Sequence, residues 1–144
     1  MVKSYTDKIC LLYQPQDFDP AKKYPVIFHY YEGSKDYLHR YLVPGLSEGA
    51  LNIPWYVSNG YIVFVPHIHT RQRHPGNSAA RAVIRAAKYL AAFNWVQQGK
   101  MGLQGHSFGG YVTNYVITHT QLFAAAQASA GPTDFSADME LSEK

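Results

Sequence analysis

Short apolar stretches alternate with longer amphipathic ones along most of the chain. Residues 8–14 (KICLLYQ) and 25–31 (PVIFHYY) have the β-branched and aromatic content typical of strands, and the second begins with the proline that a strand tolerates at its first position. Residues 61–66 (YIVFVP) form an almost continuous apolar run, which indicates a strand buried on both faces. The alternation of such stretches with helical ones predicts an α/β fold built on a mainly parallel sheet.

The clearest helix is predicted over residues 78–93. Val83, Ala87 and Leu90 recur at helical spacing on one face, and arginine and lysine side chains occupy another. Ser78 can accept a hydrogen bond from the first free amide groups and so cap the start of this helix. We therefore expect the helix to pack on the sheet through its apolar face.

Several other segments have weaker patterns. Residues 49–58 predict a short helix that is interrupted or restarts at Pro54, and residues 34–44 predict a long loop. Residues 111–120 are rich in Val, Ile and Thr, as strands are, but they follow a glycine turn and we interpret them as a buried helix. Residues 122–130 are ambiguous, because their alanines favour a helix while their place in the alternation favours a strand.

The composition is that of one globular domain or part of one. The chain has 144 residues, of which 47% are hydrophobic and 16% charged. Its 13 basic and 10 acidic residues form no block of like charge, so neither nucleic acid nor a membrane surface is an expected partner. Cys10 is the sole cysteine, and no run approaches the roughly 20 apolar residues of a membrane span. Nothing in the sequence indicates a cellular location.

One motif suggests chemistry. Residues 105–109 (GHSFG) match the pattern G-x-S-x-G, and they follow a short predicted strand at residues 100–104. In this motif the serine lies on a tight strand-to-helix turn, in which only glycine fits two positions before and after it. The sequence therefore predicts Ser107 as a nucleophile, with the backbone N–H of Phe108 directed at the negative charge of a tetrahedral intermediate. The alternative interpretation is an ordinary glycine-rich turn.

These segments resemble the catalytic domain of the prolyl oligopeptidase family, the serine peptidases that include dipeptidyl and acylaminoacyl peptidases. The similar stretches span most of residues 8–135 and read KKYPVIF, YEG, NGY, VFVP, MGLQGHSFGGY, LFAAA and AGPTDF. The resemblance implies an α/β-hydrolase fold, a mainly parallel sheet sandwiched by helices. It also implies hydrolysis of peptide substrates through an acyl-enzyme on Ser107, with no cofactor.

The resemblance extends to further site residues. Tyr31 corresponds to the tyrosine whose hydroxyl donates to the oxyanion beside the Phe108 amide, although the chain has Tyr-Glu-Gly where Tyr-Gly-Gly is commoner. The alternative interpretation of Tyr31, on residue type alone, is an amphipathic residue at a strand end. Phe108 and Phe135 correspond to an apolar pocket for a small residue such as proline, so both are expected to bind substrate.

The sequence does not offer a base and an acid in the expected order. In this fold an acid and then a histidine follow the serine, but the one histidine after Ser107 is His119, which precedes every downstream acid. We therefore expect residues 1–144 to be part of an α/β-hydrolase catalytic domain, truncated after the strand that follows the nucleophile helix. The later strands, the acid and the histidine would then be absent. Such a chain should be at most feebly active, and it should form homo-oligomers through the sheet edge left bare at residues 122–130.

Rival interpretations remain open. His67, His69 and His74 could bind a metal, but no carboxylate or cysteine stands near them, so no metal is expected. His67 or His69 could instead replace the missing base, and His106 is expected to pack or hydrogen-bond below the serine. An esterase or lipase would use the same elbow, and a non-catalytic fragment would keep the fold without the chemistry.

Overall fold

Six strands form one sheet in the computed structural model, which describes residues 2–5, 8–31, 41–45, 51–68, 70 and 75–133. The strands are β1 (Val2–Tyr5), β2 (Lys8–Tyr13), β3 (Tyr24–Tyr30), β4 (Ile62–Val65), β5 (Val96–His106) and β6 (Ala125–Ser129). The helices are α1 (Ile53–Ser58), α2 (Pro75–Ala91) and α3 (Phe108–Ile117). Across the sheet the strand order is β1-β2-β4-β3-β5-β6.

The sheet is parallel over four of these strands. β4, β3, β5 and β6 pair in parallel, whereas β1 pairs with β2, and β2 with β4, in antiparallel fashion. The expectation of a mainly parallel sheet is therefore confirmed. All four residues of β4 are buried, as the apolar run at residues 61–66 predicted.

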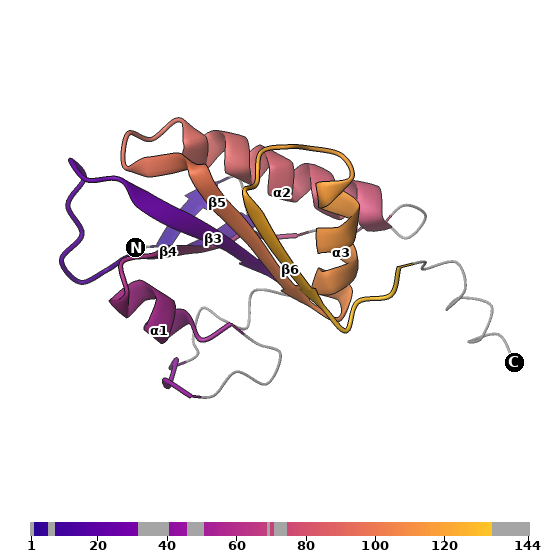
Figure 1. Ribbon diagram of the computed structural model, residues 1–144, viewed down its shortest axis with the longest axis horizontal. Coiled ribbons are helices and arrows are strands. Elements are labelled where there is room, and N and C mark those ends of the chain that lie inside the picture. Colours follow the sequence, from indigo (N-terminus) through magenta and orange to yellow (C-terminus); the bar gives the residue numbers. More distant parts are fainter. Residues whose placement is uncertain are drawn as a thin grey trace, which may run out of the picture.

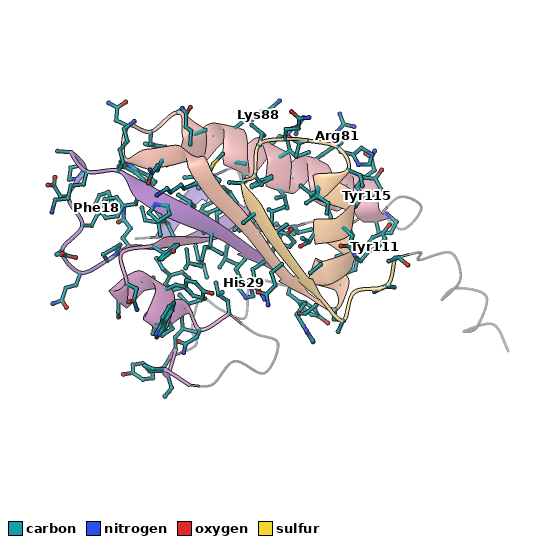
Figure 2. The ribbon with its side chains drawn as sticks, viewed as in Figure 1. Phe18, His29, Arg81, Lys88, Tyr111 and Tyr115 are labelled. Carbon is teal, nitrogen blue, oxygen red and sulfur yellow. The ribbon has the colours of Figure 1, made fainter. Side chains whose placement is uncertain are left out.

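Side chains of the central strands alternate between two apolar layers. Ile62 and Phe64 belong to the larger core, to which α2 and α3 contribute, while Val63 and Val65 pack with Ile53 of α1 in a smaller cluster. Figure 1 shows the corresponding arrangement, with α1 on one side of the sheet and α2 and α3 on the other. Arg81 and Lys88 are exposed and lie on the side of α2 that faces away from the sheet (Figure 2), as the helical spacing predicted.

The strand connections step in opposite directions after β3 and β5, which makes the carboxyl ends of these two strands a topological switch point. From β3 the chain passes through α1 to β4, and from β5 it passes through α3 to β6 on the opposite side. Right-handed crossovers that step in opposite directions place their helices on opposite faces, as Figure 1 shows. The connections after β3 and β5 therefore diverge above two neighbouring strand ends, which is where α/β sheets bind their ligands.

The main departures from the predicted boundaries have local causes. The long helix begins at Pro75 rather than Ser78, because proline suits the first turn of a helix. Ser78 is therefore not the cap, and its hydroxyl donates instead to the Pro75 carbonyl oxygen at 3.1 Å. β5 also begins at Val96, ahead of the predicted start at residue 100, because the polar or exposed residues 97–99 interrupt the apolar signal after buried Val96.

The two ambiguous segments after the glycine turn are both resolved by the structure. The segment at residues 111–120 is helical, and its helix α3 starts at Phe108. The segment at residues 122–130 contains strand β6. The short helix at residues 49–58 is α1, which starts beside Pro54 with the Asn52 side chain accepting from the Trp55 amide at 3.1 Å. Most of the predicted loop at residues 34–44 lies outside the described residues.

β6 is an edge strand in the part of the chain that the structure describes. It pairs there with β5 alone, and its residues 125–128 are exposed. The strand contains no proline and no charged residue, the two features that commonly prevent edge strands from pairing with other chains. We propose that a second copy of the chain pairs along β6.

This proposal predicts that the chain sediments as dimers or larger assemblies. Gln127→Lys should lower the associated fraction, because a charge on the edge strand opposes pairing. Gln121→Lys adds the same charge at an exposed position before β6 and should leave association unchanged. Light scattering or analytical ultracentrifugation over a range of concentrations gives the measurement, and a monodisperse monomer at every concentration would contradict the proposal.

Candidate active site

Ser107 forms a one-residue turn between β5 and α3. β5 ends at His106 and α3 begins at Phe108, so the predicted strand, sharp bend and helix over residues 101–111 are confirmed. The backbone of Ser107 has φ 54° and ψ −119°, a combination that residues other than glycine rarely adopt. Strained backbone of this kind occurs where a protein must hold a functional side chain in one place.

Backbone hydrogen bonds hold the strained turn from both sides. The Ser107 N–H donates to the carbonyl oxygen of Ser129, at the end of β6, over 2.9 Å. The Ser107 carbonyl oxygen accepts from the Tyr111 N–H over 3.1 Å, within the first turn of α3. The Phe108 N–H belongs to the first turn of this helix, where the helix dipole favours negative charge. The turn can therefore offer a backbone donor to an anion.

The glycines of the motif are required by close contacts. A Cβ at Gly105 would collide with the Gly109 carbonyl group and lie 2.7 Å from Thr113 Oγ1. A Cβ at Gly109 would lie 2.5 Å from the carbonyl oxygen of Tyr30, at the end of β3. The first turn of α3 thus rests directly on the ends of β3 and β5, and a side chain at either glycine would force it away.

Tyr31 lies at the neighbouring strand end. Tyr30 pairs with Gly105 in the parallel register, and Tyr31 continues β3 by one residue toward the end of the sheet at which Ser107 follows β5. The Tyr31 side chain is 42% exposed. The structure therefore brings Tyr31, Ser107 and Phe108 to adjacent strand ends at the same edge of the sheet. Phe135 lies outside the described residues.

The histidines near Ser107 along the chain have other positions and contacts. His106 Nδ1 lies 3.1 Å from the Ser129 hydroxyl oxygen, a cross-strand contact just below the serine, as the sequence predicted. His119 lies beyond the far end of α3, a helix of ten residues that is about 15 Å long. Its ring is exposed and stacks on Tyr115, with the ring centroids 4.2 Å apart.

One buried polar pair was missed by the sequence analysis. His29 of β3 and Gln104 of β5 are register partners and are 3% and 5% exposed. His29 Nδ1 lies 2.5 Å from Gln104 Oε1, and because an amide oxygen only accepts, Nδ1 carries the proton. Burial lowers the pKa of His29 below its ordinary 6.5, and the hydrogen bond to Gln104 opposes this shift only in part. The alternation of β3 places His29 on the same face as half-buried Ile27, which could have indicated an inward-facing histidine but not its partner.

No metal centre occurs among the described residues. No group of three or more His, Cys, Asp or Glu side chains there is close enough to hold a metal ion. His67 follows β4 and is half-buried, while His69 and His74 lie outside the described residues.

Among the residues that the structure describes, none of the helices has the length and apolar content needed to cross a bilayer.

Comparisons with known proteins relate this geometry to one family. The model of the prolyl oligopeptidase family matches residues 48–144, more than half of the chain. A protein of Ajellomyces dermatitidis named dipeptidyl-aminopeptidase B is 35% identical over 113 residues, which are 69% of this chain and 12% of that protein. The chain therefore spans only a small part of the length of such relatives.

Solved structures share the fold. A crystal structure from Bacteroides ovatus, described as a dipeptidyl aminopeptidase IV, superposes on 90% of this chain and 20% of its own with a TM-score of 0.70 and 27% identity. Dipeptidyl peptidase 4 of Porphyromonas gingivalis superposes on 86% of this chain and 19% of its own with a TM-score of 0.68 and 24% identity. The fold is therefore that of an α/β-hydrolase, as the sequence predicted.

The close contacts of the glycines predict a stability difference within β5. Gly105→Ala should lower the free energy of unfolding by about 3 kcal/mol, because rigid backbone must move to admit the new methyl group. Gly102→Ala is the matched control, since its Cβ would meet nothing nearer than the Ala125 carbonyl oxygen at 3.6 Å. Urea denaturation of the two variants measures the difference, and equal losses of stability would contradict the packing described.

The buried His29 predicts a dependence of stability on pH. Its pKa is lowered in the folded chain, so below pH 6.5 the unfolded state binds a proton that the folded state does not. Stability should therefore be complete above pH 6.5 and fall as the pH drops, by up to about 1.4 kcal/mol per pH unit from this group. In His29→Leu the free energy of unfolding should fall less steeply as the pH drops from 7.5 to 5, because the contribution of His29 is lost. This difference in slope is expected whatever the change in absolute stability. Identical slopes in urea titrations of the two proteins would contradict the assignment.

Proposed function

The chain belongs to the prolyl oligopeptidase family of serine peptidases, and from that premise we propose that Ser107 is the nucleophile of a peptide-bond hydrolase. The observation that carries the proposal is the strained backbone of Ser107, which turns between a parallel strand and a helix at the carboxyl end of the sheet. This geometry lifts a serine out of the packed layers toward a bound substrate.

In the proposed reaction Ser107 Oγ attacks the carbonyl carbon of the scissile peptide bond. The hydroxyl proton passes to a base, and the carbonyl oxygen becomes the oxyanion of a tetrahedral intermediate. Collapse of this intermediate breaks the C–N bond, and the amine leaves with a proton from the conjugate acid of the base. An ester on Ser107 remains, and water then hydrolyses it to release the acid and restore the hydroxyl.

Two donors are proposed to stabilise the oxyanion. Phe108 would contribute its backbone N–H from the start of α3, and Tyr31 would contribute its hydroxyl from the end of β3. Donors that are already in place when charge develops stabilise the transition state, and the loss of one lowers the rate by about 10²- to 10³-fold in serine hydrolases.

A peptide is the proposed substrate. The relatives and the solved structures carry the names dipeptidyl-aminopeptidase and dipeptidyl peptidase, which favour peptides over simple acyl esters. We propose that Phe108 and Phe135 line an apolar pocket for a small side chain such as proline, next to the scissile bond. An esterase that uses the same elbow is the competing outcome, and it would prefer acyl esters.

The proposal includes feeble activity for residues 1–144 alone. The neighbouring His106 contacts the Ser129 side chain, and His29 is buried with Gln104. His119 lies past the far end of α3. His67 follows β4, which lies two strand spacings, about 10 Å, from β5. None of these described histidines is placed to take the proton of Ser107, and without a base the covalent route loses most of its rate.

A fluorophosphonate probe and an activated ester test these statements together. The chain should turn over the ester close to the uncatalysed rate and should react slowly with the probe at Ser107, as peptide mass spectrometry would show. Ser107→Ala should abolish labelling, whereas Ser58→Ala, which changes an exposed serine at the end of α1, should not.

Other outcomes are equally informative. Rapid ester turnover that Ser107→Ala abolishes would contradict the proposal that residues 1–144 are feebly active. The absence of any labelling at Ser107 would favour a non-catalytic fragment. In a longer protein that contains this chain, proline-containing peptides compared with acyl esters would separate a peptidase from an esterase.

A further inference from the structure

Two fully buried hydroxyl groups lie directly beneath the candidate site. Tyr30, the last residue of β3, and Thr113 of α3 are each 0% exposed, and their side-chain oxygens are 2.8 Å apart. Thr113 Oγ1 also donates to the carbonyl oxygen of Gly109 over 2.9 Å. These contacts form a continuous hydrogen-bonded chain from β3 to the first turn of α3.

The direction of each hydrogen bond in this series follows from the number of protons on each hydroxyl group. A threonine hydroxyl has one proton, and that of Thr113 is used on the Gly109 carbonyl oxygen, so the Tyr30 hydroxyl must be the donor to Thr113. Tyr30 therefore has to remain protonated. Burial raises the pKa of Tyr30 well above its usual range, although the hydrogen bond to Thr113 opposes the shift, so the phenol stays neutral.

The two ends of this series of hydrogen bonds, Tyr30 and Gly109, are sequence neighbours of the two proposed oxyanion donors. Tyr30 immediately precedes Tyr31, and Gly109 immediately follows Phe108. The donors themselves come from elements 77 positions apart in sequence (108 − 31), on a strand and a helix that no covalent constraint holds together. The Tyr30–Thr113–Gly109 chain is a specific link between the two.

We propose that Tyr30 and Thr113 are positioning residues that set the separation of the Tyr31 hydroxyl and the Phe108 N–H. The proposal rests on the proposed function of Ser107. Phenylalanine and valine would fill the same volumes without the cost of burying two hydroxyl groups, so packing alone does not account for the polar pair. A hydrogen bond fixes distance and direction where an apolar contact permits sliding.

The test uses three variants and a matched control on the same strand. Tyr30→Phe and Thr113→Val remove the hydroxyl groups, and Thr113→Ser keeps one. Tyr24→Phe also removes a hydrogen-bonded hydroxyl from a buried tyrosine of β3, since Tyr24 Oη accepts from the Asp19 N–H at 2.9 Å. Tyr24 stacks on Phe18, which Figure 2 shows at the opposite end of the molecule from Tyr111 of α3.

The first measurement is the rate of fluorophosphonate reaction at Ser107, at temperatures at which every variant is folded. Tyr30→Phe and Thr113→Val should react about tenfold more slowly than the unmodified chain, as a small displacement of catalytic groups would cause. Thr113→Ser should restore the rate, and Tyr24→Phe should not change it. Equal rates for Tyr30→Phe and Tyr24→Phe would overturn the proposal.

The second measurement does not depend on reactivity. Amide chemical shifts are read on the element opposite each substitution, at Phe108 for Tyr30→Phe and at Tyr31 for Thr113→Val. Both should move, and neither should move in Tyr24→Phe. Unchanged shifts would overturn the link between the donors even if Ser107 reacts. Failure of the unmodified chain to react at Ser107 would instead overturn the proposed function, and the shifts would still decide whether the pair couples the two sites.

Discussion

The contact of the first turn of α3 with the ends of β3 and β5 is the constraint on which the rest of the structure depends. It requires glycine at 105 and 109, because a Cβ at either position would strike main-chain atoms. A second close approach, between Gly110 and Gly131, seats the same turn against the end of β6. With α3 held this near, the start of the helix faces the ends of the two central strands, and Ser107 makes the strained turn between β5 and the helix.

The topology accounts for the location of the site without reference to any catalytic residue. The chain leaves β3 in one direction and β5 in the other, so their loops diverge above adjacent strand ends. Any side chain just after either strand then lies near the switch point, and Tyr31 and Ser107 occupy these two positions. Residues far apart in sequence come to adjacent strand ends because of strand order.

Local patterns in the sequence predicted the elements that carry strong signals. Three local patterns predicted their elements from a few residues each, and all three were confirmed. They are the apolar run at residues 61–66, the amphipathic helix and the glycine-flanked serine. The starts of β5 and α2 were predicted wrongly, because the polar or exposed residues 97–99 interrupt the apolar pattern of β5 and a proline in the first helical turn lacks apolar periodicity. The pairs His29–Gln104 and Tyr30–Thr113 could not be predicted, since each joins residues about 80 positions apart whose contact is set by strand register.

The hydrogen bond from the Ser107 amide to Ser129 has a consequence for the order in which the polypeptide matures on the ribosome. A nascent chain that has emerged only as far as α3 already contains the whole serine motif, yet it lacks the strand whose carbonyl group holds the serine in its unfavourable conformation. During synthesis this residue is therefore free to relax until β6 has been added to the sheet. A polypeptide interrupted before this strand would therefore contain the serine motif without the conformation that the strand stabilises.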